Sequence, residues 1–99
     1  MRIFFERTGG FAGRKLTGSL DSSALPALQA RRLNKLLEQS HFFDLPVKME
    51  STSPGADRFL YRLTVETENI THTVEACEAA LPAEMRPLRD FLAGSLFVK

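Results

Sequence analysis

The chain has 99 residues, of which 43% are hydrophobic and 25% charged, and 13 basic against 12 acidic residues leave a formal net charge of +1. Two domains would each be too small to fold comfortably alone, so we expect a single domain over residues 1–99. The balanced charge argues against a nucleic-acid partner, which would call for a basic excess to set against phosphates.

Two further features bear on the cellular compartment. The only cysteine, Cys77, excludes an intramolecular disulfide, so the fold needs no oxidising environment. The N-terminal apolar run stops at Glu6, too early for a signal-peptide core, and no segment approaches the ~18 apolar residues of a membrane span. We therefore expect a cytoplasmic protein with no membrane partner.

The N-terminal third predicts a β-hairpin. Residues 2–8 and 14–20 have the bulk and alternation of strands, and the segment between them is rich in glycine, which adopts positive φ without steric cost. Its residues are Gly9, Gly10, Phe11, Ala12 and Gly13.

A helix is predicted over residues 24–40. Asp21, Ser22 and Ser23 are typical N-cap residues, and Pro26 suits a first helical turn. An apolar stripe at helical spacing follows, made of Leu25, Leu28, Leu33, Leu36 and Leu37. The aromatic segment 41–46 follows, and we expect it to act as a plug that closes the base of the core.

The second half predicts a polar loop, a second hairpin and a second helix. Residues 47–56 show no periodicity and are expected to form a loop. Residues 57–66 and 70–77 alternate as strands, with Phe59, Tyr61, Leu63 and Val65 on one face. Pro87 cannot lie deep inside a helix, so we expect a turn at 82–85 and the helix from about 86 to 95, with Arg89 facing outward.

These elements follow one another in the order ββαββα. A four-stranded antiparallel sheet with two helices packed on one face buries both apolar stripes at once, which places the chain in the α+β class.

Motifs for chemistry are absent from the sequence. The metal-ligand candidates His41, His72 and Cys77 have no ligand spacing, and strand parity puts His72 and Cys77 on opposite faces of the sheet. Cys77 has no activating base nearby in sequence, and the glycine-rich segment leads into a strand where a phosphate-binding loop opens a helix. We expect no catalytic residue, no metal, no cofactor and no enzymatic activity.

Phe11 is the unusual residue of the first hairpin. A large aromatic side chain at a hairpin tip either folds back onto the core or stands out to contact a partner. The residues alone leave these two interpretations open.

Four short motifs in this order and spacing resemble the emfourin family, small cytoplasmic bacterial inhibitors of protealysin and other thermolysin-like zinc metalloproteases. The resemblance covers Ile3 to about Leu92. Its motifs are Gly9-Gly10-Phe11-Ala12-Gly13, Phe42-Phe43-Asp44-Leu45-Pro46, Pro54-Gly55-Ala56-Asp57-Arg58-Phe59 with Tyr61, and Ala80-Leu81-Pro82 with Arg86-Pro87-Leu88.

The resemblance implies a protein inhibitor, a monomer when free, that occludes the cleft of a thermolysin-like metalloprotease without a covalent bond. Residues 9–13 are the expected contact, with Phe11 as the apolar anchor. The second candidate surface consists of Ser53, Pro54, Gly55 and Asp57. The simpler interpretation of Asp57 is that it caps a turn. The alternative is that a carboxylate, from Asp57 or Glu50, reaches the protease zinc.

One rival is a small α+β protein-binding or oligomerisation module with no protease target. An exposed Leu60 on the polar face of its strand would suit that function. The other rival is a small enzyme, which the absent catalytic motifs disfavour.

Overall fold

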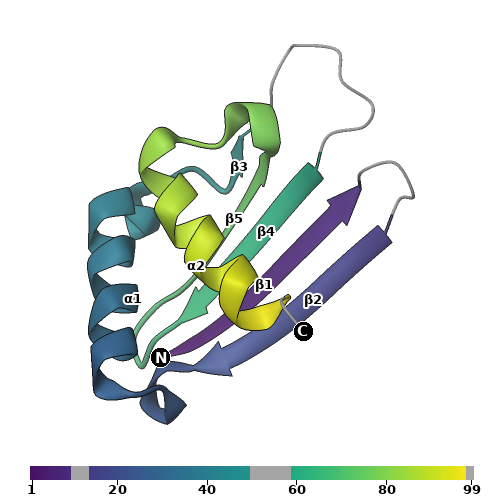
Figure 1. Ribbon diagram of the computed structural model, residues 1–99. Coiled ribbons are helices and arrows are strands. Elements are labelled where there is room, and N and C mark those ends of the chain that lie inside the picture. Colours follow the sequence, from purple (N-terminus) through teal and green to yellow (C-terminus); the bar gives the residue numbers. More distant parts are fainter. Residues whose placement is uncertain (10–13, 50–58, 98–99) are drawn as a thin grey trace.

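A computed structural model describes residues 1–9, 14–49 and 59–97 of the chain. It shows two layers, a twisted β-sheet and a pair of helices that cover one of its faces (Figure 1). The α+β class and the two helices on one face are as predicted.

The sheet has five strands and is mixed. They are β1 (Arg2–Gly9), β2 (Arg14–Asp21), β3 (Lys48–Met49), β4 (Phe59–Glu66) and β5 (Thr71–Cys77). Their spatial order is β2-β1-β4-β5-β3, and all neighbours are antiparallel except β3, which is parallel to β5.

The prediction of four antiparallel strands was therefore wrong at β3, which lies inside the segment expected to be a loop. Lys48 and Met49 pair with Glu75 and Ala76, and the backbone N–H of Glu75 donates to the Val47 carbonyl at 2.8 Å. Two residues are too few to show a periodic pattern, so this pairing depends on a neighbouring strand edge and not on local sequence.

Strand alternation builds the core. Ile3 and Phe5 of β1 are buried beside Leu63 and Val65 of β4, which they pair with directly. Val74 and Ala76 continue the apolar layer on β5. The opposite residues of these strands form a face that no helix of the described chain covers, as Figure 1 shows.

Helix α1 (Ala27–Ser40) begins later than predicted. A separate 3₁₀ turn (Ser22–Ala24) precedes it, and the Asp21 carboxylate accepts from the Ser23 N–H at 3.0 Å, so Asp21 caps that turn and Pro26 occupies the N-cap position of α1. The exposed carboxylate of Asp21 has a lowered pKa, because the backbone and hydroxyl of Ser23 both donate to its ionised form.

Leu28 does not belong to the buried stripe of α1. Its side chain is 76% exposed, whereas Leu33, Leu36 and Leu37 are buried. Five residues of helix turn the side-chain direction by about 140°, which takes Leu28 away from the direction of Leu33.

The aromatic segment after α1 closes the core through one ring. Phe42 is completely buried and meets Phe43 and His72 edge-on, while Phe43 is 40% exposed. The His72 ring Nε2 lies 2.8 Å from the Leu45 carbonyl, which ties this segment to β5.

Helix α2 (Arg86–Leu96) follows a 3₁₀ turn (Ala83–Met85), close to the predicted bounds, and Pro87 lies in its first turn. Leu88 and Leu92 are fully buried. Its last residue, Leu96, packs against Gly18 of β2 so closely that a Cβ atom at Gly18 would lie 2.9 Å from the Leu96 Cβ. Within the described ranges, no helix is long and apolar enough to cross a membrane.

Gly18→Ala should lower the free energy of unfolding by about 1–3 kcal/mol, because the new methyl group meets a Cβ that only a shift of α2 can move. Gly94→Ala is the matched control: nothing lies within 4 Å of its added Cβ, and alanine stabilises a helix by about 0.5–1 kcal/mol over glycine. Urea unfolding of both variants measures the difference. Equal stability of the two would contradict the close approach.

Candidate functional site

The ends of β1, β2 and β4 that border the two predicted contact segments lie together at one end of the sheet. Gly9, the last residue of β1, pairs with Arg14 of β2 and with Phe59 of β4. Gly9 has a φ of 108°, a backbone conformation that side-chain-bearing residues rarely adopt. Gly9, Arg14 and Phe59, three of the residues that border segments 10–13 and 50–58, therefore lie side by side on neighbouring strands (Figure 1).

Most of the predicted contact residues lie outside the described residues. Of the nine, the structure describes Gly9 alone and brings it beside Phe59. The contact predictions for the others remain predictions; they are Gly10, Phe11, Ala12, Gly13, Ser53, Pro54, Gly55 and Asp57.

A group of aromatic and charged side chains occupies the helix-covered face near this end of the sheet. We call it the strand-end cluster. Its members are Phe5, Arg7, Phe59, Tyr61, Glu78, Arg89 and Phe97.

The apolar part of the strand-end cluster is a stack of three rings. The ring centre of Phe5 lies 5.2 Å from that of Phe97, with an interplanar angle of 14°. It lies 5.9 Å from the ring centre of Tyr61, with an interplanar angle of 6°. The Arg7 guanidinium lies 4.7 Å from the centre of the Phe59 ring and 5.4 Å from that of Phe97. These contacts join β1, β4 and the residue that follows α2 into one packed unit.

The polar part of the strand-end cluster centres on Glu78. The Tyr61 hydroxyl donates to Glu78 Oε1 at 3.1 Å, and Arg89 Nη1 lies 3.7 Å from the same oxygen. Arg89 also donates to Asp90 at 3.0 Å and lies over the Tyr61 ring. Burial lowers the pKa of Arg89, but the hydrogen bond to Asp90 and the nearby negative charges reverse this, and the net shift is upward.

The phenol of Tyr61 has a pKa that its surroundings raise. Burial raises its pKa above the ordinary phenol value of 10.0, and the Glu78 carboxylate raises it further, because it repels a phenolate and accepts the phenol hydrogen bond. Arg89 and Arg7 act in the opposite direction. The group is thus held as a neutral hydrogen-bond donor.

Sequence reasoning found part of the strand-end cluster. Strand alternation correctly put Phe59 and Tyr61 on the inner face. The prediction that Arg89 faces outward was wrong: its side chain is 21% exposed, because the carboxylate of Glu78 and the ring of Tyr61 hold it against the domain. A helical pattern does not indicate such a partner, since Glu78 comes from a different element.

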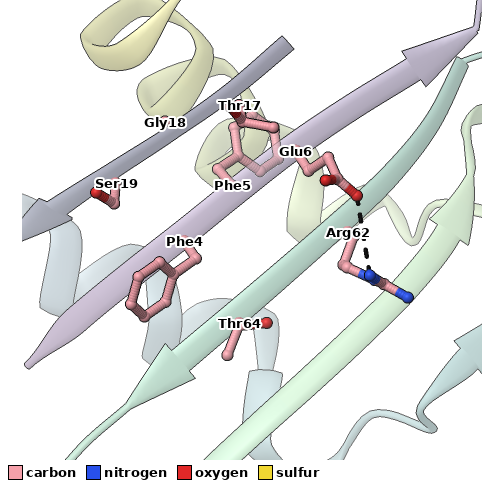
Figure 2. A pocket seen from close by; sticks show the side chains of 8 residues that line it. All are labelled: Phe4, Phe5, Glu6, Thr17, Gly18, Ser19, Arg62 and Thr64. Atoms are coloured by element: carbon pink, nitrogen blue, oxygen red, sulfur yellow. Dashed lines mark ion pairs between the residues drawn. The ribbon is translucent and has the colours of Figure 1, made fainter. Parts of the chain in front are cut away.

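The uncovered face of the sheet carries a shallow groove of about 350 Å³. Figure 2 shows Phe4 beside Thr64 in this groove and Glu6 paired with Arg62. Charges alternate across the strands. The Glu6 carboxylate lies 3.1 Å from Lys15 Nζ and 4.0 Å from Arg62 Nη1. Arg62 Nη2 lies 3.2 Å from the Glu75 carboxylate. Each pair joins a half-buried glutamate to an exposed basic side chain, so the charges neutralise one another and offer a ligand no concentrated charge.

The described residues contain no group of three or more histidine, cysteine and acidic side chains that could hold a metal ion. His72 shares the inner face of β5 with Val74 and Ala76, whereas Cys77 has the opposite parity and pairs with Leu60. The parity prediction for these two residues is confirmed.

The fold and this site describe a class of protein, a small α+β domain with a converged strand end that carries a packed arginine–aromatic cluster. The family model named Emfourin matches residues 5–93, and the chain belongs to the Emfourin family. By the resemblance described above this is a family of inhibitors, and the chain is not an enzyme.

No curated protein matches the chain. Among solved structures, emfourin from Serratia proteamaculans, described as an M4 family peptidase inhibitor, is similar at 23% identity and a TM-score of 0.47, with 88% of this chain and 83% of that chain covered.

Tyr61 should titrate above pH 10, and Glu78→Gln should move its pKa part of the way back, leaving the shift caused by burial. Because the unfolded chain releases the phenol proton first, this group makes the free energy of unfolding fall as the pH rises above about 10. The chain has one tyrosine and no tryptophan, so the ultraviolet absorbance of phenolate reports Tyr61 alone. An unchanged titration in Glu78→Gln would show that the carboxylate does not act on the phenol.

Proposed function

We propose that this protein inhibits thermolysin-like zinc metalloproteases of the protealysin type by occluding the active-site cleft without a covalent bond. The observation that carries the proposal is membership of the Emfourin family over residues 5–93. The emfourin of known structure that resembles this chain is itself described as an inhibitor of M4 peptidases.

The architecture is consistent with inhibition by occlusion. A blocking protein needs a scaffold whose contact end is ordered before binding, because each side chain immobilised in the complex costs about 0.5–1.5 kcal/mol. Gly9 and Phe59, which adjoin the two predicted contact segments, are paired strand residues, and Arg7 packs between their strands and the end of α2. The pairing and the arginine–ring contacts thus hold these two strand ends together before a partner binds.

Phe11 is the proposed apolar anchor, with Gly9, Gly10, Ala12 and Gly13 letting the backbone approach the enzyme. Ser53, Pro54, Gly55 and Asp57 form the proposed second contact. Their segment joins the domain at Phe59, the residue that pairs with Gly9.

A direct assay tests the inhibitor function. Increasing amounts of the protein are added to thermolysin at fixed concentration, and hydrolysis of a fluorogenic peptide is followed. We expect activity to fall to near zero at about equimolar protein, without time-dependent loss of intact inhibitor. Full activity in excess protein, both with thermolysin and with a protealysin-type enzyme, would favour the alternative, a protein-binding module with no protease target.

Phe11→Ala tests the proposed anchor. Truncation of a central aromatic anchor costs about 2–4 kcal/mol of binding, a roughly 30- to 700-fold rise in the inhibition constant. The control is Leu28→Ala, which removes a side chain of α1 that is 76% exposed and should leave inhibition unchanged. Circular dichroism confirms that both variants fold. If Phe11→Ala inhibits as well as Leu28→Ala does, Phe11 is not the anchor.

A further inference from the structure

The side chain of Arg7 is the one charged member of the strand-end cluster on β1. Its guanidinium lies over the rings of Phe59 and Phe97, and the residue is half-buried. Within residues 1–9, 14–49 and 59–97, no carboxylate lies within ion-pairing distance of Arg7. Arg89, the other arginine of the cluster, already holds Glu78 and Asp90.

This arrangement suits recognition of a carboxylate. A guanidinium over an aromatic ring keeps its planar fork of N–H donors at the edge, where a carboxylate accepts two parallel hydrogen bonds. The rings also hold the long side chain in place, so less conformational entropy is lost when the partner arrives. A surface arginine without such contacts would have to be ordered on binding.

Arg7 lies close to Gly9 and Phe59, the strand residues that border the two predicted contact segments. It lies two residues before Gly9 on β1 and pairs with Tyr61, while Gly9 pairs with Phe59. Both Arg7 and Gly9 have the inner-face parity of β1, the face on which Phe59 and Phe97 lie. A protein that covers the end of the sheet at Gly9 thus comes within reach of the guanidinium.

We propose that Arg7 is a recognition residue of this inhibitor and binds an aspartate or glutamate side chain on the protease surface beside the cleft. The inference rests on the proposed function and assigns a second kind of contact, charged and salt-sensitive, next to the apolar contact of the hairpin. Because the whole chain has a net charge of only +1, a strong salt dependence of inhibition would have to come from local charge pairs.

The test compares Arg7→Met with Arg2→Met. Methionine keeps an unbranched apolar stem against the rings and removes the charge. Arg2 is the matched control, since it also lies over a phenylalanine ring, that of Phe4, on the same strand about 17 Å away. The inhibition constant of thermolysin and of a protealysin-type enzyme is measured with each protein as the ionic strength rises from about 0.05 to 0.5 M.

We expect Arg7→Met to inhibit at least about tenfold more weakly at low salt and to lose most of the salt dependence of the wild type, while Arg2→Met matches the wild type. A merely structural role of Arg7 would weaken inhibition equally at all salt concentrations and lower the melting temperature, and that result overturns the proposal. Unchanged inhibition by a folded Arg7→Met also overturns it.

The wild-type protein supplies an independent measurement in case Arg7→Met does not fold. Wild-type inhibition that is constant across the salt range contradicts a charged contact. A wild type that inhibits neither enzyme contradicts the proposed function itself, a result distinct from an inhibitor in which Arg7 is dispensable.

Discussion

The register between β1 and β4 is the constraint on which the rest of this structure depends. It sets Ile3 against Val65 and Phe5 against Leu63 in the core, and with the same alternation it sets Arg7 against Tyr61 and Gly9 against Phe59 at the strand end. A shift of one residue would turn every one of these side chains to the other face. Core formation and assembly of the strand-end cluster are consequently one event, because buried apolar pairs at one end of β1 fix the position of the arginine and glycine at the other.

Helix α2 depends on the same strand through its neighbour β2. Gly18 pairs with Phe5, and its missing side chain lets Leu96 approach the sheet. The next residue, Phe97, then stacks on Phe5 and lies under the Arg7 guanidinium. A glycine in a strand usually weakens it, and here that weakness is offset by the packing that the close approach of the helix permits.

A feature of this fold could be predicted from the sequence when it depends on residues that are close together in the chain. Alternation is a local property, and it correctly indicated the inner faces of β4 and β5 and hence the places of Tyr61 and Val74. The parallel pairing of β3 and the inward position of Arg89 depend on Glu75 and on Glu78, partners distant in sequence, so no local pattern contains them. Leu28 shows that a local pattern can also mislead. Its spacing is close to that of the apolar stripe of α1 and it was predicted to belong there, but helical rotation directs its side chain into solvent.

The strand-end cluster also explains how a domain this small can keep one end of its sheet ordered. Its residues come from β1, β4, the turn after β5, α2 and the residue beyond α2, so the packed side chains join these elements at one end of the sheet. A domain of this size has little apolar core to spare, and stacked rings add packing energy where the core thins out. Because Phe5 belongs to both the core and the stack, the energy that folds the domain also orders the end of the sheet to which Gly9 and Phe59 belong. For the inhibitor proposed above, the strand ends that border the two contact segments therefore need little further ordering when a protease binds.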